Sequence, residues 1–249
     1  MDKSAKEKKK KTENTDYGQK RNSVVVKVGM VGDQQIGKTS LMVKYVEGQF
    51  DEDYIQTLGV NFMEKSVVVR GTEITFSIWD LGGQRDFLSM LPLVCNDASA
   101  ILFMFDLSRK STLNSVKEWY RQVRALNRNA LAFLIGTKYD QFVTFTPEEQ
   151  EEITNQARKF ARAMKAPLIF SSTQAAVNVT KIFKVVLAKT FDLKCNIPEI
   201  SNIGEPIMEY RTDFSAGKPR DTPRAGEAAP AASTPVAATA ATAPSPSSS

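Results

Sequence analysis

Eight residues near the start of the chain have the types and spacing needed to hold a row of phosphates. Residues 32–39 read GDQQIGKT, which fits the pattern G-x-x-x-x-G-K-[ST] between a strand-like run and a helix-like run. The glycines let successive backbone N–H groups face an anion, Lys38 would reach the β- and γ-phosphates, and the Thr39 hydroxyl would ligate Mg²⁺. The segment therefore predicts a P-loop for a nucleoside triphosphate. Its expected binding residues are Gly32, Asp33, Gln34, Gln35, Ile36, Gly37, Lys38, Thr39 and Ser40.

A second polar motif, residues 137–140 (TKYD), follows a buried strand-like run and indicates which base is bound. An Asp at the carboxyl edge of an open sheet can accept two hydrogen bonds from guanine N1–H and N2–H₂, a donor pair that adenine lacks. Asp140 therefore predicts a guanine nucleotide, and we expect the apolar stem of Lys138 to lie along the base.

Residues 80–84 (DLGGQ) end another strand-like run and carry groups suited to phosphate hydrolysis. Asp80 is expected to hold Mg²⁺ through water, the Gly83 N–H to meet the γ-phosphate, and Gln84 to orient an attacking water. Thr57, in the polar segment after the first predicted helix, is a candidate second hydroxyl ligand. The expected cofactors are Mg²⁺ and GTP or GDP as the bound nucleotide. The expected catalytic residues are Lys38, Gly83 and Gln84, and the expected metal ligands are Thr39, Thr57 and Asp80.

The segments that must position these motifs alternate between strand-like and helix-like patterns. Continuous apolar strands separated by helices are typical of a parallel, doubly wound α/β sheet. The two strands on either side of Gly71 are joined by a tight turn, so they must be antiparallel. We therefore expect an α/β fold with a six-stranded, mostly parallel sheet and one antiparallel strand. The predicted strands are residues 24–31, 61–70, 73–79, 100–106, 130–135 and 168–170, and the predicted helices are 38–47, 87–93, 111–126, 147–164 and 179–193.

The composition excludes several other chemistries. The chain has 249 residues and no histidine, which excludes Ser-His and Cys-His nucleophile pairs, His-ligated metals and imidazole proton shuttles. Its two cysteines, Cys95 and Cys195, can form neither a disulfide framework nor a zinc site, and they indicate a reducing, cytoplasmic compartment. No apolar run approaches the roughly 20 residues needed to span a bilayer, and no signal-peptide pattern opens the chain.

The net charge of +5 is concentrated at the two ends of the chain. Residues 1–22 hold eight basic and four acidic residues, and residues 211–249 hold four and three, which leaves 21 of each sign between them. A neutral folded part argues against a nucleic-acid partner. Because the Lys-rich head and the Ala-, Pro-, Ser- and Thr-rich tail lack apolar periodicity, both are expected to be disordered. The predicted units are a disordered head (1–22), a folded domain (23–194), a C-terminal extension (195–214) and a disordered tail (215–249).

Together these motifs resemble the Ras superfamily of small GTPases over residues 24–194, which implies the P-loop NTPase fold known as the G domain. Residues 54–62 (YIQTLGVNF) are similar to Rab proteins, whereas Thr137 in place of the usual Asn is Rho-like. The resemblance assigns further nucleotide contacts to Phe50 at the guanine edge, Tyr54 over the phosphates, and Ser172, Thr173 and Gln174 in the loop that touches the base carbonyl.

The P-loop, the TKYD motif and residues 197–210 (IPEISNIGEPIMEY) resemble a narrower group, the fungal septum-promoting, mitotic-exit GTPases. This resemblance implies a cytoplasmic switch at the spindle pole body, bound to a scaffold there. The implied partners are a protein kinase effector, a two-component GTPase-activating complex with a TBC-type subunit, and an exchange factor. Another interpretation of residues 197–210 is a strap that packs its Ile and Met side chains onto the domain. Many Ras-superfamily chains end in a prenylated cysteine, but this sequence ends in Pro-Ser-Ser-Ser, so no lipid anchor is expected.

We interpret the chain as a GTP-binding, GTP-hydrolysing molecular switch that is slow without an activating protein. Two loops, around Thr57 and around Gly83, would be held by the γ-phosphate and Mg²⁺ and released on hydrolysis. Three alternatives remain open from the residues alone. They are another Rab-like signalling or trafficking GTPase, a nucleotide-stabilised binding module that does not hydrolyse, and a P-loop small-molecule kinase.

Overall fold

The computed structural model describes residues 23–50 and 56–211, and its strands there form one seven-stranded sheet in the order β2-β3-β1-β4-β5-β6-β7. Strands β1, β3, β4, β5 and β6 run parallel, whereas β2 pairs antiparallel with β3 and β7 antiparallel with β6. The strands are β1 (Ser23–Val31), β2 (Val60–Val69), β3 (Thr72–Leu81), β4 (Ala100–Asp106), β5 (Leu131–Thr137), β6 (Leu168–Phe170) and β7 (Met208–Glu209).

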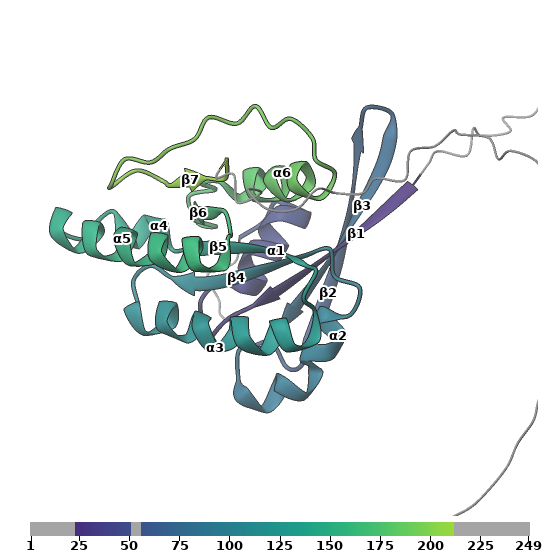
Figure 1. The fold of residues 1–249 in the computed structure, drawn as a ribbon, viewed down its shortest axis with the longest axis horizontal. Coiled ribbons are helices and arrows are strands. Elements are labelled where there is room, and N and C mark those ends of the chain that lie inside the picture. The colour runs from purple at the N-terminus through teal and green to yellow at the C-terminus, as the bar shows by residue number, and fades with distance from the viewer. Residues whose placement is uncertain (1–22, 51–55, 212–249) are drawn as a thin grey trace, which may run out of the picture. The chain divides into compact units, whose positions relative to one another are not determined.

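Helices cover both faces of this sheet, and Figure 1 shows α3 and α6 on opposite sides of it. Helices α1 and α6 pack on one face, and α2, α3 and α5 pack on the other. Each face has one cluster of buried apolar side chains beneath its helices. None of the helices in the described part of the chain is long and apolar enough to cross a membrane. The helices are α1 (Lys38–Glu47), the 3₁₀ helix η1 (Arg85–Met90), α2 (Leu91–Cys95), α3 (Lys110–Leu126), α4 (Tyr139–Phe142), α5 (Pro147–Met164) and α6 (Val179–Thr190).

Burial on both faces explains the continuous apolar pattern of the central strands. Every residue of β4 is buried, because parallel strands covered by helices on both sides have no solvent-facing positions. On one face Tyr45 of α1 stacks on Phe183 of α6 with ring centroids 3.7 Å apart. On the other, Phe142 meets Phe170 edge to face at 5.5 Å. These contacts join α1 to α6 on one face and α4 to β6 on the other.

The predicted α/β fold is confirmed, and all six predicted strands are present. The prediction missed the seventh strand β7 and the helix α4, because segments of two and four residues are too short to show a period. The single helix predicted over 87–93 is wrong, since η1 is followed there by the separate helix α2. Pro92 lacks the N–H that would continue the helix between them. The predicted tails, 1–22 and 215–249, lie outside the described residues.

Candidate functional site

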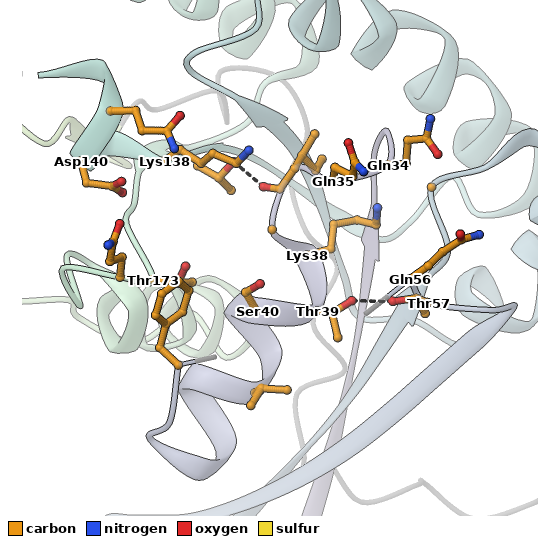
Figure 2. Close-up of a pocket in the computed structure, with 18 of the residues that line it drawn as sticks. Gln34, Gln35, Lys38, Thr39, Ser40, Gln56, Thr57, Lys138, Asp140 and Thr173 are labelled. Atoms are coloured by element: carbon orange, nitrogen blue, oxygen red, sulfur yellow. Dashed lines mark hydrogen bonds between the residues drawn. The ribbon is translucent and has the colours of Figure 1, made fainter. Parts of the chain in front are cut away.

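The loops after β1, β3, β5 and β6 and the segment before β2 open onto one cavity of about 690 Å³. Figure 2 shows its two ends, with Asp140 and Lys138 on one side and Lys38, Thr39 and Thr57 on the other. The carboxyl ends of parallel strands are where open α/β sheets bind ligands. The predicted residues that line the cavity are Gln34, Gln35, Ile36, Gly37, Lys38, Thr39, Ser40, Phe50, Thr57, Gly83, Gln84, Thr137, Lys138, Asp140, Thr173 and Gln174.

Lys38 is folded back into the P-loop, where its ammonium group donates to two backbone carbonyls. The Lys38 Nζ lies 3.0 Å from the Gly32 oxygen and 2.8 Å from the Asp33 oxygen. Burial lowers the pKa of Lys38, and the carboxylates of Asp80 and Asp33 oppose this shift. Gly32 has φ +147°, and a side chain there would overlap the Met104 carbonyl, so only glycine fits this turn. The P-loop backbone therefore surrounds the ammonium group of Lys38.

Three oxygen-bearing side chains meet beside this lysine. The Thr39 and Thr57 hydroxyl oxygens are 2.6 Å apart, and Thr39 donates to Asp80 Oδ2. The other carboxylate oxygen, Asp80 Oδ1, is buried and has no hydrogen-bond partner among the described residues. Burial raises the pKa of Asp80, although Lys38 and both hydroxyls oppose the shift. A set of hydroxyl and carboxylate oxygens with one unused acceptor fits the hard ligands that Mg²⁺ prefers.

At the opposite end, Asp140 is held by the loop that follows β6. The Ser172 hydroxyl donates to Asp140 Oδ1, and the Tyr139 N–H donates to the Ser171 carbonyl at 3.1 Å. Lys138 adopts a left-handed conformation with φ 58°, which turns the chain into α4 and brings Asp140 to the cavity wall. The two loops at this end of the cavity are therefore joined directly.

Thr137 links this end of the site to the P-loop. Its hydroxyl oxygen lies 2.6 Å from the Ile36 carbonyl and 2.9 Å from the Phe105 carbonyl, and the group is buried. A hydroxyl has one proton to donate, so it alternates between these two acceptors. Thr137 therefore connects the end of β5 directly to the P-loop backbone.

Asp106, at the end of β4, joins the two ends of the cavity, and the sequence reasoning missed it. Its fully buried carboxylate accepts from Lys138 Nζ at 2.8 Å and from Arg109 Nε at 2.9 Å. Arg109 also donates through its NH2 group to the Gln34 carbonyl at 2.9 Å. Although burial alone would raise the pKa of Asp106, hydrogen bonds from Lys138 and Ser108 outweigh it and lower that pKa. An Asp that ends an apolar strand at the ligand edge was the available signal.

Gly83 and Gln84 lie against the P-loop at the phosphate end. A side chain on Gly83 would overlap the Gln34 nitrogen, so the two loops approach as closely as backbones allow. The Gln84 Nε2 lies 3.5 Å from Gln34 Oε1. On the far side of the loop, Trp119 Nε1 donates to Asp33 Oδ1 at 2.9 Å and so anchors the loop to α3. No pattern in the sequence indicates this Trp119 contact.

Five predicted site residues do not line the cavity. Gly32 and Asp33 lie beneath it and accept from Lys38, and Asp80 and Ser172 lie behind Thr39 and Asp140. Tyr54 is outside the described residues. Four residues line the cavity without having been predicted, namely Val43, Gln49, Gln56 and Gln141.

The fold and this arrangement of loops agree with a match to the model of the Ras family, which covers residues 27–192. The chain therefore belongs to the Ras family. Members of this family bind GTP or GDP with Mg²⁺ and hydrolyse GTP. The chain is therefore a GTP-binding protein of the small GTPase class. In the described part of the chain no three Cys, Asp or Glu side chains are grouped so that they could hold a metal ion.

Curated relatives place the chain more narrowly. It is 70% identical over 191 residues to "Septum-promoting GTP-binding protein 1" of Schizosaccharomyces pombe, covering 77% of this chain and 96% of the relative. It is 28% identical over 181 residues to "Ras-related protein SEC4" of Saccharomyces cerevisiae, covering 72% and 81%. It is 26% identical over 174 residues to "Ras-related protein Rab-22A" of Homo sapiens, covering 70% and 87%. The resemblance to the septum-promoting group is confirmed.

Proposed function

We propose that this protein is a GTP- and GDP-bound switch that promotes septation and mitotic exit. The observation that carries the proposal is the cavity with a buried lysine at one end and an available carboxylate at the other. A polyphosphate fits the first end and the donor edge of guanine fits the second. The septation role follows from 70% identity to a relative whose name describes that role.

Each proposed role follows from where the group lies. Lys38 and the Gly83 N–H would neutralise charge on the γ-phosphate, and Gln84 would orient the attacking water. When bound, Mg²⁺ would neutralise charge that builds up between the terminal phosphates, with Thr39, Thr57 and Asp80 as the groups that hold it. The other residues that the sequence predicts to contact the nucleotide are proposed to make those same contacts.

The switch would act through the two loops that flank the phosphate end. Thr57 and Gly83 lose their contacts when the γ-phosphate leaves, and the loops that carry them can then rearrange. Next to them Leu58 is 75% exposed and Phe62 is 56% exposed, with Phe62 stacked on Trp79. An apolar surface whose shape depends on the nucleotide suits a protein partner. We propose a protein kinase effector there, with a TBC-containing two-component activator, an exchange factor and a scaffold at the spindle pole body as further partners.

Phosphate release separates this function from its rivals. The protein is expected to release phosphate from GTP and not from ATP, and addition of small acceptor molecules is expected to have no effect. A small-molecule kinase would transfer the phosphate to an acceptor, and a binding module would release none. Expression in fission yeast that lacks the septum-promoting GTP-binding protein tests the cellular role. Restored septa are expected, and a protein that hydrolyses GTP but restores none would contradict the septation role alone.

Replacing Thr39 with asparagine is expected to give an inactive form that favours GDP. The Thr39 hydroxyl lies 2.6 Å from Thr57 and donates to Asp80, so its loss removes one of the three oxygens proposed to hold Mg²⁺. GTP is expected to weaken more than GDP, because the bound metal would neutralise the charge of the γ-phosphate, which GDP lacks. Equilibrium titration with fluorescent GTP and GDP analogues measures the ratio. Thr39→Ser keeps the hydroxyl and serves as control, and an unchanged ratio in Thr39→Asn would argue against the metal role.

A further inference from the structure

Beyond the last helix the chain returns to the sheet as a strap, defined here as residues 197–211. Figure 1 shows it as the yellow-green segment that arcs past α6 and ends at β7. Its β7 pairs with β6, and the Phe170 N–H donates to the Ile207 carbonyl at 2.8 Å. Ile207 and Met208 are completely buried, one in each of the two apolar clusters. The strap is therefore an integral part of both cores, as the second interpretation of residues 197–210 predicted.

Polar contacts fix the strap to α5 and to itself. Arg158 of α5 donates to Glu209 Oε1 through Nε at 3.0 Å and NH2 at 2.6 Å, and also to the Ser201 carbonyl. Two backbone hydrogen bonds of 3.1 and 2.9 Å join Ile200 to Met208. The strap thus has its own hairpin-like order, and one arginine holds both of its arms.

The outer bend of this strap contacts both loops of the base end of the cavity. The Tyr139 hydroxyl donates to the Gly204 carbonyl at 2.7 Å. Asn178, which is buried at the end of the loop after β6, donates to the Pro206 carbonyl at 3.2 Å and to the Phe170 carbonyl at 2.8 Å. Tyr139 directly precedes Asp140 in the chain. The strap therefore contacts the neighbour of the residue that is proposed to bind the base.

These contacts form a hydrogen-bond network that connects the strap to both loops around Asp140. The Tyr139 N–H donates to Ser171, the Ser172 hydroxyl donates to Asp140, and Gly204 and Pro206 accept from Tyr139 and Asn178. Without the strap, β6 would be the edge of the sheet and both loops would lose their outer support. A carboxylate must keep its place to within a fraction of an ångström to accept two hydrogen bonds at once.

We propose that the strap positions Asp140 for guanine recognition and thereby slows release of the bound nucleotide. Tyr139, Asn178 and Arg158 act as positioning residues, because they contact the strap and not the base. The inference rests on the proposed guanine-binding function. It predicts that loosening the strap weakens recognition of the base, while the hydrogen bonds that hold Lys38 in the P-loop, at the other end of the cavity, stay as they are.

The test measures release of fluorescent GDP and IDP from the full chain carrying Tyr139→Phe or Arg158→Met. Removal of one neutral hydrogen bond costs about 1 kcal/mol, so GDP release is expected to become about fivefold faster in Tyr139→Phe. IDP lacks the 2-amino group and has only one donor for Asp140, so its release is expected to change less. The matched control is Tyr120→Phe on α3, where the ring packs on Phe103. Its GDP and IDP release rates are expected to equal those of the wild type.

Each outcome decides a separate question. Wild-type rates in both strap variants would overturn the inference, and so would equal acceleration of GDP and IDP, which indicates general loosening. Arg158→Met touches neither loop directly, so a reduced GDP-to-IDP discrimination in this variant supports action through the strap. Thermal unfolding of each variant identifies any that fails to fold, and the other variant then carries the test. A wild-type protein that does not retain GDP would instead overturn the proposed function itself.

Discussion

Asp140→Asn is expected to change the preferred base from guanine to xanthine. Under the proposed function the carboxylate would accept from the N1–H and N2–H₂ groups of guanine, whereas an asparagine amide can donate to the C2 carbonyl of xanthine. Ser172 donates to Asp140 Oδ1, and an asparagine oxygen in that place accepts the same bond, so the new side chain keeps its orientation. Sites built around buried hydrogen bonds reject a mismatched ligand by factors of about 10⁴. We expect the relative affinity for GDP and XDP to invert by at least about 100-fold.

Competition between GDP and XDP for the wild type and the variant measures this change. Asp192→Asn, beyond the end of α6, removes the same charge outside the cavity and is the matched control. Asp140→Ala is expected to lose affinity for both nucleotides. If Asp140→Asn still prefers GDP as strongly as the wild type, another residue reads the base.

Gln84→Leu is expected to slow unassisted GTP hydrolysis and yet to leave strong stimulation by a TBC-type activating complex. The resemblance to the Ras superfamily implies that Gln34 occupies the P-loop position at which Ras proteins keep glycine, and its amide lies 3.5 Å from Gln84. A side chain there crowds the approach of a Ras-type arginine, whereas TBC-type activators bring both an arginine and a glutamine. Because an arginine supplied in trans is worth about 10³ to 10⁵ in rate, most of the stimulation is expected to follow the activator's residues.

Single-turnover phosphate release from the wild type and Gln84→Leu, each with and without the activating complex, tests this expectation. Gln156→Leu, on α5 and hydrogen-bonded to Asn114, makes the same change of side chain away from the cavity. Loss of stimulation in a Gln84→Leu protein that still binds the complex would return Gln84 to the Ras-like role. Unchanged basal hydrolysis would show that Gln84 does not orient the water.

Local patterns predicted the parts of the site that depend on local geometry. The P-loop lies between β1 and α1, and residues 137–140 lie at the carboxyl end of β5, because the glycines and strand ends of each motif are contiguous in the sequence. The Thr39, Thr57 and Asp80 cluster was also predicted, although its members are far apart in the sequence. The predicted topology brings Thr39 and Asp80 together, since neighbouring parallel strands end at the same edge of a sheet, whereas Thr57 was predicted only as a hydroxyl in the polar segment before β2.

The rest of the site depends on tertiary contacts that leave no periodic trace. Trp119 belongs to the apolar stripe of α3, and nothing in that stripe marks its hydrogen bond to Asp33. Tyr139 begins α4 and Asn178 directly precedes α6, and their shared dependence on the strap appears only when β7 pairs with β6. A strand of two residues has too few positions for an alternating pattern, so its place could not be predicted.

The Asp106 carboxylate couples ligand binding at the two ends of the cavity. It pairs with Lys138 on the base side and with Arg109, which holds the Gln34 carbonyl, on the phosphate side. Under the proposed function, phosphates that order the P-loop also order the partners of the base, and reciprocity requires the base to strengthen phosphate binding by the same factor. The two ends of the site therefore bind the base and the phosphates cooperatively. One molecule that carries both groups gains from this cooperativity in full, whereas guanosine or pyrophosphate alone must order the shared carboxylate network unaided.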